Sequence, residues 1–137
     1  MKTIVVGYDD TEPAKRALER AATLAKAFGS QLIITSVAAV LAPAGHGMSA
    51  VDPVDSPEVH EAELAEARTF LAALGLEAEL VPGIGHPVTT IVDLADERDA
   101  DLIIVGTREL GAVQRLFGGS VSAGVSKHAH CDVLIVH

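Results

Sequence analysis

Aromatic residues are scarce in this chain of 137 residues, at 3%, and tryptophan is absent. The core therefore has to be built from Val, Ile, Leu and Ala. Cys131 is the single cysteine, which excludes an internal disulfide framework. No run of about 18 apolar residues occurs, so we expect no membrane span, and the first apolar run is too short for a signal peptide. These absences predict a soluble, cytoplasmic protein.

Positive charge is also in deficit, because 10 Lys and Arg stand against 19 Asp and Glu, for a net charge of −9. Without a basic patch, electrostatic capture of nucleic acid or of an anionic membrane is disfavoured. The acidic residues are spread through candidate helices, which indicates a solvated surface. The length and the hydrophobic fraction of 49% predict one globular domain over residues 1–137.

Five short apolar segments alternate with four segments of helical periodicity. The predicted strands are residues 4–7, 32–37, 77–81, 102–106 and 133–136. The predicted helices are residues 13–28, 57–74, 87–94 and 121–127. Three of these helices begin at a proline, which suits a first helical turn, and the first two end before glycines that suit a helix C-terminus. Residues 38–55, rich in Gly, Pro and Asp, are predicted to be a long loop that is functional or mobile.

Strict alternation of strand and helix predicts an α/β fold, with a doubly wound parallel sheet between two helical layers and right-handed crossovers. In such sheets, ligands bind beyond the carboxyl ends of the strands, where the strand order reverses. Asp9, Val37 and the loop that begins at Gly106 each follow or end a predicted strand. We therefore expect these three to be neighbours at one edge of the sheet.

A glycine-rich segment from Gly106 to Ser122 joins the fourth strand to the last helix. Glycines let backbone N–H groups approach an anion, and a helix N-terminus favours negative charge. The hydroxyls of Ser120 and Ser122 add donors. The segment is interpreted either as a phosphate-binding loop or as an ordinary strand-to-helix connection with glycine turns.

The same segment resembles the nucleotide-binding signature of the universal stress protein family, in which Gly106 matches the first glycine and Gly119-Ser120 the end. Residues 7–11, 85–87 and 128–136 resemble other turns of that family, so the resemblance covers nearly the whole chain. It implies five strands in the order 3-2-1-4-5, a homodimer through the strand from Val133 to Val136, and ATP binding by members with the full signature.

The resemblance also implies a set of binding residues. Asp9 matches an aspartate near the adenosine, and Val37 matches a residue that lines the adenine pocket. The ribose and phosphate loop corresponds to Gly106, Thr107, Arg108, Gly119, Ser120, Val121 and Ser122. Mg²⁺ is expected only with the phosphates. Glu109 stands where the signature has its second glycine. Its carboxylate is predicted to repel the nucleotide, unless it turns to solvent and pairs with Arg108 or Arg115 or accepts Mg²⁺ bridged to the phosphates.

Three functions follow as hypotheses. The first is a regulatory module that binds ATP or a related adenine nucleotide with little or no catalysis, because the loop offers Arg108 and Arg115 but no dedicated base. The second is a dimeric stress-response interaction protein whose nucleotide pocket is impaired by Glu109. The third is an enzyme acting on another small anionic ligand, since this fold supports many chemistries.

Other motifs are weaker. The segment 83–88 begins like a dinucleotide fingerprint but lacks its third glycine and contains Pro87. A cluster of His and Cys near the C-terminus suggests metal ligands by type, but it coincides with an ordinary helix-to-strand turn. That cluster consists of His128, His130, Cys131 and Asp132. Asp9 and Asp10 are interpreted as one helix cap and one pocket-facing group. No Walker A motif is present, and no Ser-His-Asp arrangement can be defended from residue order alone.

Overall fold

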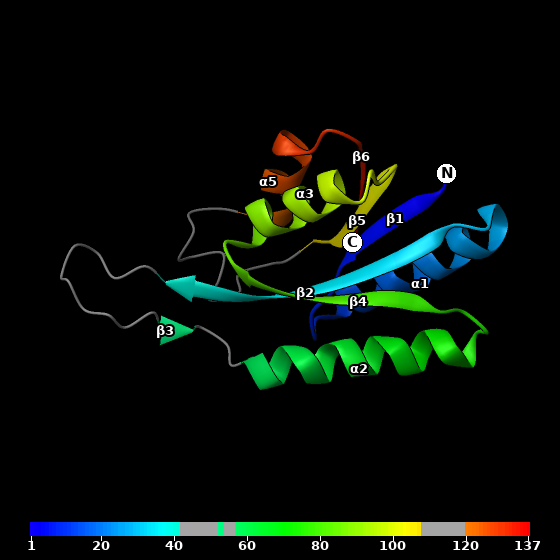
Figure 1. Cartoon of the computed structure of the whole chain (residues 1–137), viewed down its shortest axis with the longest axis horizontal. Coiled ribbons are helices and arrows are strands. Elements are labelled where there is room, and N and C mark those ends of the chain that lie inside the picture. The colour runs from blue at the N-terminus through cyan, green and yellow to red at the C-terminus, as the bar shows by residue number, and fades with distance from the viewer. Residues whose placement is uncertain (42–51, 54–56, 108–119) are drawn as a thin grey trace.

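The computed structural model describes residues 1–41, 52–53, 57–107 and 120–137 (Figure 1). The strands are β1 (Thr3–Gly7), β2 (Gln31–Leu41), β3 (Asp52–Pro53), β4 (Ala78–Gly85), β5 (Leu102–Gly106) and β6 (Asp132–Val136). The helices are α1 (Glu12–Phe28), α2 (Pro57–Ala73), α3 (Pro87–Glu97) and α5 (Val121–His128).

Five of the strands form a parallel sheet in the order β4-β2-β1-β5-β6. Counted along the chain without the two-residue β3, which pairs antiparallel with the end of β2, this order is 3-2-1-4-5. In the central register, Val5 of β1 lies between Ile33 of β2 and Ile103 of β5. The predicted doubly wound α/β class and its strand order are therefore confirmed.

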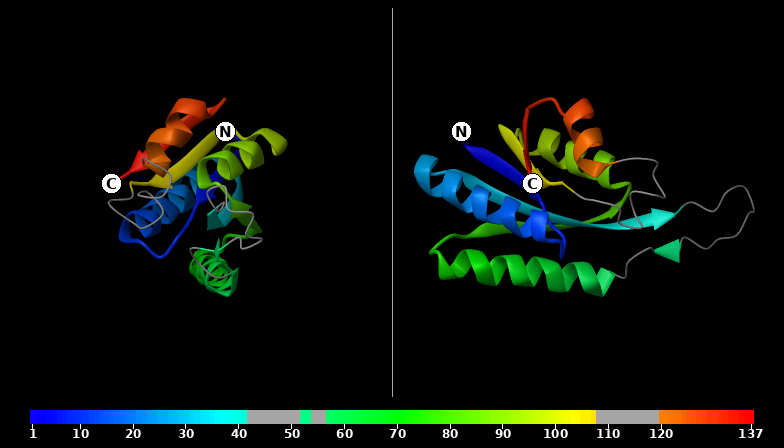
Figure 2. Two further views of the ribbon diagram at one scale, coloured as in Figure 1. Left: turned by 90° about the vertical axis from the view of Figure 1, so that its left-hand side faces the viewer. Right: turned by 180° about the vertical axis from the view of Figure 1, so that it is seen from behind.

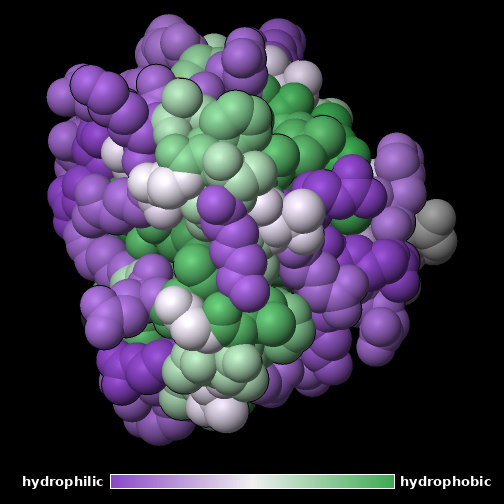
Figure 3. All heavy atoms as spheres, turned by 90° about the vertical axis from the view of Figure 1, so that its right-hand side faces the viewer, coloured by the Kyte–Doolittle hydropathy of each residue, from purple (hydrophilic) through white to green (hydrophobic). Residues whose placement is uncertain are grey.

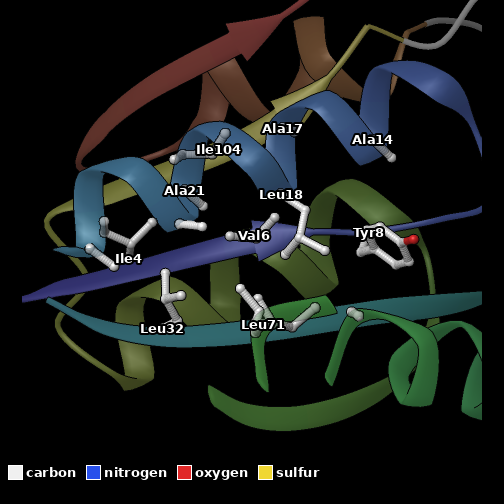
Figure 4. Close-up of a cluster of buried hydrophobic side chains, with 14 of the residues drawn as sticks. Ile4, Val6, Tyr8, Ala14, Ala17, Leu18, Ala21, Leu32, Leu71 and Ile104 are labelled. Carbon is white, nitrogen blue, oxygen red and sulfur yellow. The ribbon is translucent and has the colours of Figure 1, made fainter. Parts of the chain in front are cut away.

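The sheet separates two hydrophobic clusters, because successive side chains of a strand point to opposite faces. Ile4 and Val6 pack with α1 and α2 on one face, whereas Val5 packs with α3 and α5 on the other. Figure 2 shows the two helical layers from two further sides. Figure 4 shows Val6 of β1 together with Leu18 of α1 and Leu71 of α2 in the first cluster.

Helix α1 begins at a hydroxyl cap. Thr11 Oγ1 accepts the backbone N–H of Ala14 at 3.3 Å, Pro13 lies in the first turn, and Gly29 ends the helix at a φ of 65°. The expectation that Asp9 or Asp10 caps this helix is therefore wrong. Thr11 is better placed because its extended backbone precedes the first helical residue directly, as a cap requires.

Two strands are longer than predicted. Strand β2 continues to Leu41 and pairs with β4 as far as Gly85, so the predicted loop over 38–55 is wrong for residues 38–41 and for β3. The apolar run 38–41 contains no strand breaker. Pro82 is tolerated because β4 is an edge strand of the parallel sheet, where a missing N–H need not cost a ladder bond. The rest of that loop prediction lies outside the described residues.

The end of the molecule where the chain begins has several exposed hydrophobic side chains. Figure 3 shows hydrophobic side chains gathered in a band on this face, between hydrophilic borders. Met1, Phe28 and Leu74 are exposed, and they sit before β1 and at the C-terminal ends of α1 and α2. Within the described ranges, no helix has both the length and the apolar character to cross a bilayer.

Candidate functional site

A cavity of about 400 Å³ opens at the carboxyl ends of β1 and β5, beside Thr35 and Val37 in the middle of β2. Its lining comes from these strands, from the β1–α1 turn, and from residues of α2, α3 and α5. The strand order reverses here, because β1 is flanked by β2 on one side and by the later strand β5 on the other. This is the place where open α/β sheets bind their ligands.

Four of the predicted site residues line this cavity: Asp9, Val37, Gly106 and Val121. Ser120 lines an adjoining groove of about 340 Å³ between the N-terminal part of α3 and the length of α5. Two further predicted site residues, Thr107 and Ser122, lie beside the cavity without lining it. The Thr107 N–H donates to the Val136 carbonyl at 2.8 Å, and Ser122 is buried. Arg108, Gly119 and Glu109 lie outside the described residues.

Asp9 is held in a fixed orientation by its own turn. Its Oδ1 accepts the Thr11 backbone N–H at 2.9 Å and the Thr11 hydroxyl at 2.5 Å. An aspartate that accepts from a residue two positions later closes an Asx turn. The β1–α1 turn therefore presents a preorganised carboxylate to the cavity.

Gly106 is required by packing. A Cβ at this position would lie 2.5 Å from the Pro13 carbonyl carbon and 2.6 Å from the Ala14 nitrogen, both backbone atoms. The first glycine of the family-like signature therefore lets the end of β5 lie directly against the first turn of α1. That close approach closes one side of the cavity.

Helix α5 starts beside the cavity with a serine cap. Ser120 Oγ accepts the Ala123 backbone N–H at 3.3 Å and lies 2.7 Å from Ser122 Oγ. The capped N-terminus and its two hydroxyls can attract an anion.

Sequence reasoning missed a buried polar cluster on the α2 side of the cavity. Ser36, in the middle of β2, and His60 and Glu63, on α2, are 0%, 6% and 7% exposed. His60 Nδ1 lies 2.9 Å from Glu63 Oε1 and 2.5 Å from Ser36 Oγ, and Ser36 Oγ donates to Glu63 Oε1 at 3.1 Å. His60 and Glu63 line the cavity. Their spacing along α2, with Leu64 and Ala67 on the same buried face, is the signal that could have placed them inward.

This cluster does not have the geometry of a hydrolytic triad. Ser36 and Glu63 both contact the same imidazole nitrogen, so the ring cannot pass a proton from one to the other. Ser36 is also absent from the cavity lining. Burial raises the pKa of the Glu63 carboxyl, an effect that His60 and Ser36 oppose and that Asp9 reinforces.

A second polar link joins α2 to the end of β1. The Tyr8 hydroxyl donates to Glu66 Oε1 at 2.9 Å. Burial, and next the acceptor and negative charge of Glu66, raise the pKa of the Tyr8 phenol. Tyr8 therefore stays protonated and keeps the β1 exit tied to α2.

The described residues on the opposite side of the cavity are apolar, apart from one hydroxyl. Val37, Ile91, Val105 and Val121 line it, together with Thr35, which is 1% exposed. Thr35 Oγ1 has no hydrogen-bond partner among the described residues. Burying a hydroxyl without a partner costs free energy.

The C-terminal His and Cys residues do not converge. His130 Nδ1 lies 3.1 Å from both carboxylate oxygens of Asp96 on α3 and is exposed, whereas Cys131 packs at the rim of the second hydrophobic cluster. Across the part of the chain that the structure describes, no group of three or more His, Cys, Asp or Glu is arranged to hold a metal ion.

The fold and the site together define a class, that of doubly wound α/β proteins with a small-ligand cavity at the strand-order reversal. The Universal stress protein family profile matches residues 1–137, and the chain belongs to that family.

Individual members of this family are similar to the chain over nearly its whole length. The universal stress protein Rv1636 of Mycobacterium tuberculosis is 36% identical, with 99% of this chain and 96% of the relative covered. Sll1654 of Synechocystis is 35% identical, with 98% and 85% covered.

Solved structures are similar as well. A universal stress protein in complex with cAMP is 35% identical with a TM-score of 0.74, over 99% of this chain and 96% of that one. The protein from Archaeoglobus fulgidus in complex with dAMP is 25% identical with a TM-score of 0.75, over 100% and 98%.

Proposed function

We propose that this protein is a cytoplasmic regulatory module, one domain over residues 1–137, that binds an adenine nucleotide in the cavity and performs little or no catalysis. The observation that carries the proposal is the cavity at the strand-order reversal, lined by Asp9, Val37 and Gly106. The similar structures bound to cAMP and dAMP support it.

The chemistry of the lining supports one orientation of the ligand. Val37 and the apolar side suit the flat base, and the Asp9 carboxylate suits ribose or base donors. The phosphates would lie toward the N-terminus of α5, where positive dipole charge and hydroxyls gather. We assign that end of the site to Gly106, Thr107, Arg108, Gly119, Ser120, Val121 and Ser122.

Direct identification of the ligand tests the proposal. Mass spectrometry of small molecules released from denatured purified protein should find an adenine nucleotide, and calorimetry should show that cAMP, AMP or ATP binds. Asp9→Asn should weaken binding about tenfold, as the loss of a charge-assisted hydrogen bond does. Asp93→Asn, an exposed carboxylate on α3, is the matched control and should bind as the parent does. Absence of binding for all three nucleotides would refute the function.

We propose ATP as the nucleotide, with Mg²⁺ held through its phosphates, and the charge of Glu109 should determine how tightly ATP binds. If its carboxylate repels the triphosphate, Glu109→Gly should strengthen ATP affinity about tenfold. If instead Glu109 accepts Mg²⁺, the same substitution should weaken an affinity that depends on the metal. The alternative function, a dimeric interaction protein with an impaired pocket, predicts that the parent binds no nucleotide and that Glu109→Gly restores binding.

We propose in addition a homodimer through β6. This strand is an edge of the sheet, and its Val133, Leu134 and Ile135 are only partly buried. An apolar edge strand is a liability unless it is paired, and pairing with its own copy about a two-fold axis would cover it. Light scattering should give a dimer for the parent and a monomer or aggregate for Ile135→Lys. A stable parent monomer at tens of micromolar would overturn the dimer without affecting the nucleotide proposal.

A further inference from the structure

The hydroxyl of Thr35 is a buried polar group that has no part in the function proposed above. Thr35 lines the ligand cavity and is 1% exposed, and its Oγ1 has no hydrogen-bond partner among the described residues. Most buried polar side-chain atoms in folded proteins have a partner, so an exception needs a physical reason. A valine would fill nearly the same space without the cost of an unpaired hydroxyl. The partner is therefore to be sought in what enters the cavity.

The described neighbours of Thr35 do not supply this partner. Thr35 is in register with Gly7 of β1 and with Val81 of β4. Gly7 has no side chain, and the side chains of Val81 and of the lining residue Ile91 are apolar. The Thr35 carbonyl accepts the Tyr8 backbone N–H at 2.9 Å, so this backbone acceptor is satisfied while the hydroxyl is not.

The place of Thr35 in the cavity selects the part of the ligand that it meets. Thr35 lies on the same face of β2 as Val37, because side chains two residues apart point in the same direction. It is about 7 Å further from the carboxyl end of the strand, at the usual rise per residue. The base is assigned to the wall that contains Val37, and the phosphates to the N-terminus of α5. The edge of the base, and not the ribose or a phosphate, therefore meets Thr35.

A hydroxyl at this point adds selectivity that the apolar wall lacks. Apolar contacts bind a flat ring but distinguish poorly between rings of the same shape, whereas a buried group that needs a hydrogen bond rejects a ligand that cannot make one. A hydroxyl both donates and accepts, so it suits either a ring nitrogen or an exocyclic amino group. A carbon atom at the same place would leave the hydroxyl unpaired.

We propose that Thr35 is a specificity-determining residue of the cavity, whose hydroxyl forms a hydrogen bond with a polar atom on the edge of the nucleotide base. The inference rests on the proposed function, since it concerns the base of that nucleotide. Binding of the nucleotide then satisfies a hydroxyl that is unpaired in the ligand-free protein.

Analogues of cAMP that each lack one polar atom of the base test the proposal. The 1-deaza, 3-deaza and 7-deaza forms replace one ring nitrogen by C–H, and the 6-unsubstituted purine form lacks the amino group. Calorimetry on the parent should show that the analogue without the bonded atom binds about tenfold more weakly than cAMP. In Thr35→Val that same analogue should lose less than about twofold relative to cAMP, because the partner hydroxyl has already been removed.

Three variants separate a contact with the base from a structural role. Thr35→Val should bind cAMP about tenfold more weakly than the parent although its ligand-free stability is not lower, whereas a structural role would lower both. Thr35→Ser keeps the hydroxyl and should keep the discrimination among the analogues. Thr69→Val, on the exposed face of α2, removes a hydroxyl that donates to the Ala65 carbonyl at 3.0 Å. It is the matched control and should bind cAMP as the parent does.

The outcomes distinguish this inference from the nucleotide function. If no analogue binds the parent more weakly than cAMP, the base makes no such hydrogen bond and the inference is wrong, whether or not the variants fold. If the parent and Thr35→Val discriminate among the analogues equally, another group recognises the base and the inference is also wrong. In both cases the nucleotide function stands. If the parent binds none of cAMP, AMP and ATP, the proposed function fails and this inference fails with it.

Discussion

The two sides of the cavity differ in chemistry although they are made by the same strands. On the α1/α2 side, Asp9, Asp10, His60 and Glu63 form an acidic and hydrogen-bonding wall. On the α3/α5 side the described wall is formed by valines, Ile91 and Pro87, with one hydroxyl, that of Thr35. A ligand with an apolar plane and polar donors along one edge satisfies both walls at once, which is the character of a nucleoside.

The difference arises from strand alternation. On β2, Ile34 packs with the α1/α2 cluster and Ile33 with the α3/α5 cluster. Continuing this alternation sends Ser36 to α2, where it bonds His60, and sends Thr35 and Val37 to the other face. One strand therefore supplies a polar contact to one wall and apolar contacts to the other within three residues.

Among substitutions in the two walls, we expect the largest loss of stability at Gly106, where the walls meet. Gly106→Ala drives a Cβ against the backbone of Pro13 and Ala14 and should lower the free energy of unfolding by about 3 kcal/mol. Gly7→Ala is the matched control, because its Cβ would meet only side-chain atoms of Ile91 and Val105 at 3.1 Å. Chemical denaturation should rank Gly106→Ala as the more damaging change. Equal stability of the two variants would show that β5 and α1 can separate freely.

The hydrogen bonds of the acidic wall can be removed by substituting Glu63. Glu63→Ala removes the acceptor shared by Ser36 and His60 and should cost about 2 kcal/mol, because buried donors lose a charged partner. Glu63→Gln keeps an acceptor oxygen and should cost clearly less. Urea unfolding at neutral pH measures both variants. An alanine variant as stable as the glutamine variant would mean that these hydrogen bonds contribute nothing to folding.

The pH dependence of stability tests the burial of Glu63 in this wall. Burial raises the pKa of Glu63 above its ordinary value of 4.5, so the folded state binds the proton more tightly than the unfolded chain. The contribution of this group is therefore fully present below pH 4.5 and is lost as the pH rises through the raised pKa. As the pH rises through the raised pKa, the free energy of unfolding of the parent should fall relative to that of Glu63→Gln. A constant difference would contradict the raised pKa.

The sequence predicted one wall better than the other. The continuous apolar runs 4–6 and 102–105 indicated strands buried on both faces, and Gly106 ended the second strand as predicted, so the centre of the sheet followed from local patterns. Val37 was predicted to end a strand, but β2 continues to Leu41. The polar cluster could not be predicted in this way. Ser36 is 24 positions from His60 and 27 from Glu63, and only the packing of α2 on β2 brings them together. The extension of β2 was missed for a similar reason, since its partner β4 contains Pro82 and glycines that are typical of loops.

The smallest expected effect concerns the hydroxyl of Thr35 in the apolar wall. Thr35 Oγ1 is buried without a partner among the described residues, and valine has nearly the same shape. Thr35→Val should therefore raise the stability of the ligand-free protein by about 1 kcal/mol, because it removes the cost of an unsatisfied hydroxyl. Thr35→Ser keeps the hydroxyl, loses a methyl group, and should be less stable than the parent by a similar amount. Thermal denaturation without ligand measures both changes. If Thr35→Val is destabilising instead, the hydroxyl is satisfied by a buried water, and the α3/α5 wall is more polar than its side chains indicate.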